Sequence, residues 1–309
     1  MKRCYFLIIL IPAFIFIMPV LSAQQIMDSS FSNPEFPPTY KNTKGPIVLV
    51  DVHHHNTQVK EGNYTPLFKL LEKDGFHIRF VNQLISNELL KQGKILIIIN
   101  ALSAENVDHW SLPVYPAFSI KETEIIFNWV QEGGTLLLVA DHMPFPGASE
   151  SLASRFGVQF LNGFAIDTIT WDPLLFSRRN QTLLEHSITN GRNATEQVDS
   201  VNTFWGQAFK FDESNMKGLF KFSDHVISYN PDTAWRFYDN TPVVPVTNWY
   251  QASAGSFGKG RVVILGEAGM LTAQLTGPNR VKTGMNSVGA EENFQFILNL
   301  SRWLSFQLL

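Results

Sequence analysis

Four apolar runs of this sequence are each followed at once by side chains that could bind a metal ion or move a proton. Carboxylates and imidazoles are ligands that Zn, Mn and Fe accept in proteins, and they also act as general acids and bases. These groups are Asp51, His53, His55 and Asn56 after the run 47–50, Asn100 after 94–99, Asp141 and His142 after 135–140, and Glu267 after 261–265.

The chemistry that this set predicts is metal-assisted hydrolysis, with a metal-bound water as nucleophile and a carboxylate as base. The expected catalytic residues are Asp51, Asp141, His142 and Glu267. The expected ligands of one divalent metal (Zn, Mn or Fe) are Asp51, His53, His55 and His142, and the expected substrate contacts are Asn56 and Asn100. If the strand continues past Asp51, alternation places Asp51, His53 and His55 on one side.

A structural role for the same residues is the alternative. Asp and Asn at strand ends often cap helices or tie loops, and a histidine there can bond a backbone carbonyl. The sequence contains no His-Glu-x-x-His, and the spacing matches no standard metal signature.

The elements that must position these residues alternate between strands and helices. Continuous apolar runs indicate strands buried on both faces, and helical spacing follows several of them. Ser119 with Glu122 forms a capping-box pattern at the start of one helix. We therefore expect an α/β fold, a flavodoxin-like doubly wound parallel sheet over residues 46–306, with ligands at the carboxyl ends of the strands.

The alternation breaks at about residue 161, and residues 161–250 predict a β-rich insertion that holds many aromatic side chains. Its tryptophans, which include Trp205 and Trp235, could stack on sugar rings, or they could fill a small β core. The second hypothesis for function is therefore a non-catalytic module that binds a small-molecule or glycan ligand.

Several other functions find no support. Gly-x-Ser-x-Gly, the phosphate-loop motif and Gly-x-Gly-x-x-Gly are all absent, so we expect no nucleotide cofactor. The chain carries 24 Lys+Arg against 27 Asp+Glu, a formal net charge of −3, without a basic run. Nucleic acid is therefore not an expected partner.

Residues 1–23 have the order of a secretory signal peptide. Lys2 and Arg3 precede an apolar run that ends in Ser22-Ala23. An uncleaved anchor is the alternative, and it is the one expected link to a membrane. Cys4 is the only cysteine, so the mature chain has no disulfide or thiolate. We expect an exported protein, periplasmic or secreted, in which residues 24–45 form a linker or extended arm.

Three segments resemble a known superfamily. They are Asp51 to Asn56, the run from Trp129 to His142, and Arg261 to Glu267 followed by Asn293 to Asn299. Together they resemble the class I glutamine amidotransferase-like superfamily, in its secreted branch of the DUF4350 or GIFT-domain type. The resemblance implies the flavodoxin-like fold. It does not imply amidotransferase activity, because that chemistry needs a cysteine after a buried strand, where this chain has Asp141-His142.

Overall fold

The computed structural model describes residues 25–41, 44–60, 62–171 and 173–309. The signal-like segment and Cys4 lie outside the described residues. Five parallel strands form one side of the largest sheet, in the order β3-β2-β4-β5-β15 from its edge. Their bounds are β2 Ile47–Asp51, β3 His77–Val81, β4 Ile95–Ile99, β5 Thr135–Val139 and β15 Gly260–Leu265.

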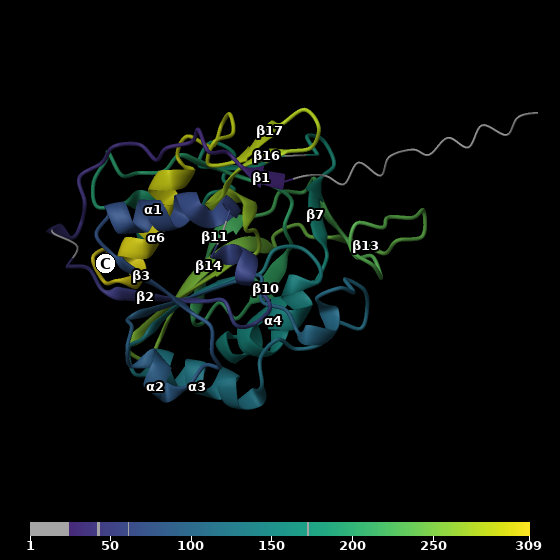
Figure 1. Ribbon diagram of the computed structural model, residues 1–309. Coiled ribbons are helices and arrows are strands. Elements are labelled where there is room, and N and C mark those ends of the chain that lie inside the picture. Colours follow the sequence, from purple (N-terminus) through teal and green to yellow (C-terminus); the bar gives the residue numbers. More distant parts are fainter. Residues whose placement is uncertain (1–24, 42–43, 61, 172) are drawn as a thin grey trace, which may run out of the picture.

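Helices cover both faces of this sheet (Figure 1). Successive strand residues point to opposite faces, so Val48 and Val50 pack on one side and Leu49 on the other. The first side is covered by α1 (Thr65–Lys73) and α6 (Asn293–Leu304). The second side is covered by α2 (Asn87–Leu90), α3 (Ile120–Gln131) and α4 (Phe145–Ala153).

Antiparallel strands extend the same sheet beyond β15. They are β14 (Tyr250–Phe257), β10 (Phe209–Phe211) and β6 (Val158–Phe160), with β11 (Met216–Lys221) also paired to β14. A hairpin across residues 258–260 joins β14 to β15. Gly258 adopts φ 60° at this turn, a conformation that glycine accepts without strain.

Smaller sheets complete the fold. β7 (Phe164–Asp167), β12 (Val226–Tyr229) and β13 (Val243–Pro245) form one, and β8 (Leu174–Ser177) pairs with β9 (Ser200–Thr203). A third contains β1 (Gln25–Met27), β16 (Ala273–Thr276) and β17 (Val281–Gly284), and α5 (Ser187–Asn190) is a single turn.

The structure therefore is an α/β fold with a mostly parallel central sheet. Two segments that the sequence predicted to be a linker or arm and an insertion form part of the packed fold. The arm 24–45 contributes β1 to a sheet, and Phe31, Phe36 and Tyr40 pack against the core. The β-rich segment 161–250 supplies β10 and β11 to the central sheet itself.

The capping box at the start of α3 is present, because Ser119 and the carboxylate of Glu122 each accept the other's backbone N–H. Among the described residues, no helix combines the length and the apolar character needed to cross a bilayer.

Candidate functional site

Asp141 and Glu267 occupy equivalent positions at the carboxyl ends of two adjacent parallel strands. Val139 of β5 pairs with Leu265 of β15, and each carboxylate lies two residues beyond its strand's member of that pair. Glu267 is fully buried, whereas Asp141 keeps part of its surface accessible. Strand register alone thus brings two carboxylates together at the rim of the sheet.

Their shared environment changes how both groups hold protons. Burial, and then the negative charge of Asp141, raise the pKa of Glu267 well above its ordinary value. Burial also raises the pKa of Asp141, although the positive charge of a protonated His142 and the hydrogen bond from the His142 backbone N–H at 2.9 Å oppose this. The two groups titrate as a pair and retain a proton to higher pH than isolated carboxyls do.

Tyr64 and Asn100 complete this cluster, which we call the rim site: Tyr64, Asn100, Asp141 and Glu267. Asn100 Nδ2 donates to the Tyr64 hydroxyl at 3.4 Å, and Asn100 Oδ1 accepts the backbone N–H of Asp141 at 3.0 Å. Burial and the charges of the two carboxylates raise the pKa of Tyr64 well above its ordinary value. The phenol therefore stays protonated beside them.

A pair of tryptophans from the β-rich segment lies next to the rim site. Trp205 and Trp235 have ring centroids 5.4 Å apart. Gly206, the residue after Trp205, lies against Glu267, since a Cβ at Gly206 would come within 2.8 Å of the Glu267 Cβ. Trp205 (φ 69°) and Trp235 (φ 64°) both have left-handed backbones, a costly conformation for large side chains that is often found at functional sites.

His142 joins the tryptophan pair to Asp141. Its ring stacks on Phe164 at 4.7 Å and meets the edge of Trp235 at 4.6 Å. Nδ1 lies 2.7 Å from the carbonyl oxygen of Met143, to which it must donate. In the neutral ring this contact leaves the lone pair on Nε2.

Asp51 lies at the same edge of the sheet, but its contacts are with the chain itself. Both carboxylate oxygens lie 3.0 Å from His54 Nδ1, and His54 Nε2 lies 3.2 Å from Glu122 Oε1. Asn56 Nδ2 donates to Asp51 at 3.2 Å and to the carbonyl of Ile99 at 3.1 Å. We call Asp51–His54–Glu122 the histidine bridge; all three side chains are buried.

The strand does not continue past Asp51, so the alternation that would place Asp51, His53 and His55 on one side does not arise. The chain bends there, with the His53 N–H donating to Asp51 Oδ1, and the bend carries His54 back onto Asp51. His53 Nδ1 instead lies 3.3 Å from Asn82 Oδ1, and His55 is exposed.

The residues expected to bind a metal are therefore not gathered into one site. In the part of the chain that the structure describes, no three His, Cys, Asp or Glu side chains are arranged to hold a metal ion. Asp51 and His54 form one cluster, and His142 belongs to the aromatic cluster beside Asp141.

Because His54 lies between two buried carboxylates, we expect removal of its imidazole ring to lower the free energy of unfolding strongly. Replacement of His54 by Gln leaves two buried carboxylates without their cation, and breaking such a pair costs about 3–5 kcal/mol. We expect the urea midpoint of His54→Gln to fall accordingly at pH 6. His77→Gln, at an exposed position of β3, is the matched control and should unfold like the parent protein.

The same variant tests how the stability provided by the histidine bridge depends on pH. Burial lowers the pKa of His54, but the carboxylates of Asp51 and Glu122 outweigh it, so the net pKa lies above 6.5. For Glu122, burial raises the pKa, and hydrogen bonds from Ser119 and Ile85 outweigh it and lower the pKa below 4.5. The stabilisation is thus complete between about pH 4.5 and 6.5 and declines as pH rises through the folded pKa of His54. A difference between parent and variant that grows with pH above 7 would contradict this assignment.

Sequence reasoning missed His54 and Tyr64. His54 follows Asp51 at the i,i+3 spacing that a turn brings together, a signal that was obscured by its two histidine neighbours. Tyr64 lies directly before α1 and has no local pattern that marks it as a rim residue.

Comparison with known proteins supports the fold and says nothing further about the site. No protein-family model matches the chain, and no curated protein matches it. Among solved structures, the chain is similar to the mmIFT52 N-terminal domain, with 14% identity, a TM-score of 0.58, and coverage of 84% of this chain and 97% of that one. A ThuA-like protein from Bacteroides uniformis also aligns, with 14% identity, a TM-score of 0.46, and coverage of 87% and 95%.

Proposed function

We propose that the protein is a hydrolase that acts on a small polar or carbohydrate-derived substrate at the rim site. The observation that carries this proposal is the pair of carboxylates at adjacent strand ends, Asp141 partly accessible and Glu267 fully buried. Carboxyl groups whose environments raise their pKa values are suited to donate and accept protons near neutral pH.

In this proposal Asp141 touches the substrate and Glu267 is a positioning residue. Asp141 donates its proton to the leaving oxygen, and the bond between that oxygen and the substrate breaks as a water oxygen attacks. His142 Nε2 takes the proton released by that water. The negative charge that Asp141 gains on ionising raises the pKa of Glu267, so Glu267 keeps its proton and stays neutral beside Asp141.

The metal-assisted version of this hydrolysis lacks support from the geometry, because the expected ligands lie in two separate clusters. The chemistry proposed here therefore uses the side chains of the chain itself. The test is turnover of a panel of chromogenic glycosides and esters across pH 4–9. Turnover that falls as Asp141 loses its proton would support the proposal, and absence of turnover over the whole panel would count against it.

A binding module without catalysis is the second candidate, and the observation that favours it is the Trp205–Trp235 pair. Aromatic faces next to polar side chains suit the apolar face of a sugar ring. Trp235 is 47% exposed even though it contacts Trp205, Phe164 and His142, so part of its ring remains available to a ligand.

Replacement of Trp235 by Ala separates the two functions. Loss of one aromatic contact is worth about 0.5–1.5 kcal/mol, which corresponds to roughly a 2- to 12-fold change in affinity. For a hydrolase we expect KM to rise by this factor with a smaller change in kcat. For a binding module we expect no turnover, and saturable glycan binding that Trp235→Ala weakens and Asp141→Asn leaves intact.

Trp171→Ala is the matched control for this experiment. Trp171 is 59% exposed and also has a left-handed backbone, with φ 67°. It contacts neither His142 nor the other two tryptophans among the described aromatic pairs. Equal losses in Trp171→Ala and Trp235→Ala would remove the argument for a ligand platform beside His142.

We also propose that the fold is flavodoxin-like and that the chain is related to the class I glutamine amidotransferase-like superfamily. The strand order β3-β2-β4-β5-β15 with helices on both faces supports this. Export to the periplasm or medium is a further proposal, supported by the pattern of residues 1–23 and by the absence of cysteine from residues 24–309.

A further inference from the structure

The hydroxyl of Tyr64 in the rim site has a proton for which the described residues provide no acceptor. The backbone N–H of Asp141 can only donate, so the atom of the Asn100 amide that it meets at 3.0 Å must be the oxygen. The other end of that amide is therefore the NH₂ group, which donates to the Tyr64 oxygen at 3.4 Å. Since the hydroxyl is the acceptor in this contact, its own proton must point to a different partner.

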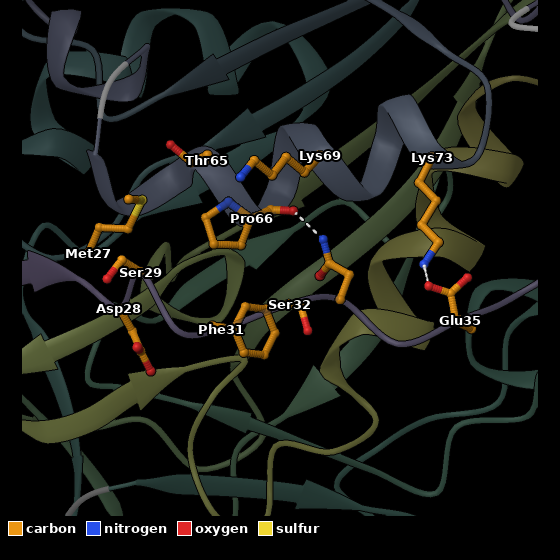
Figure 2. A pocket seen from close by; sticks show the side chains of 11 residues that line it. Met27, Asp28, Ser29, Phe31, Ser32, Glu35, Thr65, Pro66, Lys69 and Lys73 are labelled. Carbon is orange, nitrogen blue, oxygen red and sulfur yellow. Dashed lines mark hydrogen bonds and ion pairs between the residues drawn. The ribbon is translucent and has the colours of Figure 1, made fainter.

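The neighbours of Tyr64 leave that proton to a ligand or a water. The charges of Asp141 and Glu267 act on Tyr64, yet in the described part of the chain neither carboxylate accepts its proton. Figure 2 shows Thr65, the next residue, at a cavity between the N-terminal arm and α1, whereas Tyr64 is not among the described residues that line this cavity. Because Tyr64 is only 8% exposed, an unused donor there is costly, and an incoming acceptor would satisfy it.

The tyrosine and its amide partner are held in place by the fold. The Tyr64 ring belongs to the core on the α1 side of the sheet. The preceding residue, Asn63, donates from Nδ2 to Gln274 Oε1 at 3.0 Å, which ties this turn to β16. The backbone N–H of Asn100 donates to the carbonyl of Val139 at 2.9 Å. A donor fixed in this way can stabilise charge that develops during a reaction without a rearrangement.

The protonated groups of the rim site indicate which substrate they suit. Hydrolysis of a glycoside passes through a positively charged sugar ring and needs an ionised carboxylate beside it. Attack of water on an ester instead places negative charge on the carbonyl oxygen, which hydrogen-bond donors stabilise. Tyr64 is protonated, and the negative charge of Asp141 favours the protonated form of Glu267. The rim site is therefore better suited to the charge that an ester develops.

On the basis of the hydrolase function proposed above, we propose that the substrate is a carboxylic ester and that Tyr64 is a catalytic residue whose hydroxyl donates a hydrogen bond to the ester carbonyl oxygen. A water oxygen bonds to the carbonyl carbon and its proton passes to His142 Nε2, while the electron pair of the C=O bond moves onto the oxygen beside Tyr64. When that pair returns, the bond from the carbon to the alkoxy oxygen breaks and Asp141 protonates this oxygen. The products are a carboxylic acid and an alcohol, and the proton on His142 passes to solvent as Asp141 regains one.

The experiment measures acetate release from 6-O-acetyl-D-glucose, and hydrolysis of p-nitrophenyl β-D-glucoside, by the full chain and by Tyr64→Phe. We expect the parent to hydrolyse the ester. Loss of one donor to the carbonyl oxygen should lower kcat of Tyr64→Phe by about 10²–10³-fold, with little change in KM and an unchanged circular dichroism spectrum. Tyr40→Phe is the matched control, because Tyr40 is a half-buried tyrosine that packs on Phe76 outside the rim site, and it should retain full turnover.

Asn100→Asp tests the direction of the hydrogen bond without removing the hydroxyl. One oxygen of the new carboxylate keeps the N–H of Asp141, and the other replaces the NH₂ group and accepts the Tyr64 proton. Ester turnover should therefore fall, and adding Tyr64→Phe to this variant should lower it little further. Two independent losses that multiply in the double variant would contradict a shared donor.

The outcomes separate this inference from the hydrolase function on which it rests. Unchanged ester turnover in Tyr64→Phe, the result expected if a water alone satisfies the hydroxyl, would overturn the role of Tyr64 and leave the hydrolase in place. Turnover of the glycoside without the ester would overturn the ester assignment and still support a hydrolase at the rim site. Absence of turnover with both substrates would overturn both proposals.

Discussion

Asp141→Asn should reduce hydrolytic turnover by about 10²–10⁴-fold, the usual contribution of a positioned general acid or base. The amide is close in shape to the carboxyl and retains an oxygen for the backbone N–H of His142, which donates to Asp141 at 2.9 Å. The loss should therefore appear in kcat, with the fold unchanged by circular dichroism.

The same variant should change how stability depends on pH. Burial raises the pKa values of Asp141 and Glu267 above their unfolded values near 3.8 and 4.5. The native state then holds protons that the unfolded state has lost, so stability falls as pH rises from about 4 through the folded pKa values. Without the charge at position 141, this decline should be shallower, and Asp141→Asn should be at least as stable as the parent at pH 8.

Glu150→Gln is the matched control for both measurements. Glu150 lies in α4 outside the rim site, and burial raises its pKa also, while it accepts a hydrogen bond from the backbone of Phe160 at 3.0 Å. Its replacement should leave turnover intact. Full turnover in Asp141→Asn would show that Asp141 does not move the proton, whatever the stability data.

Arg302→Met should destabilise the protein by about 3–5 kcal/mol, the usual result of removing one partner of a buried ion pair. Arg302 is 2% exposed and donates to both oxygens of Asp74, at 3.0 and 3.1 Å, and to Glu196 at 3.0 Å. Asp74 is fully buried, so the variant would leave its charge without its cation.

This arginine also connects three distant parts of the chain, namely α6, the end of α1, and the β-rich segment that contains Glu196. The measurement is urea unfolding of Arg302→Met against Arg179→Met, where the arginine is exposed. Adding Asp74→Asn to Arg302→Met should recover part of the loss, because the amide carries no charge. Equal midpoints for Arg302→Met and Arg179→Met would contradict a stabilising role.

Much of the fold follows from local patterns. The run Ile95–Ile99 is apolar throughout because its strand is buried on both faces, and the capping box of Ser119 and Glu122 marks the start of α3. Such signals involve only a few neighbouring residues, so they can be recognised without knowledge of the rest of the chain. The extension of the central sheet by β10 and β11 was not predicted, because pairing with β14 depends on contacts between residues far apart in sequence.

The candidate site shows the same difference between what local sequence patterns predict and what contacts between distant residues decide. That Asp141 and Glu267 follow apolar strands is visible in the sequence, because the end of a buried run marks the edge of a parallel sheet. Which side chains face one another there was decided by tertiary structure. A strand that stops at Asp51 turns His54 inward and His55 outward, and the two carboxylates become a coupled pair because β5 and β15 are neighbours.

The sequence by itself thus determined the alternation of strands and helices and the polar groups at the strand ends, since both depend on short-range periodicity. Tertiary structure alone decided that Tyr64 lies beside two carboxylates, that Trp205 and Trp235 meet next to His142, and that Arg302 binds Asp74. Those contacts join residues up to 228 positions apart, and their energies come from burial and charge that exist only after the chain has folded.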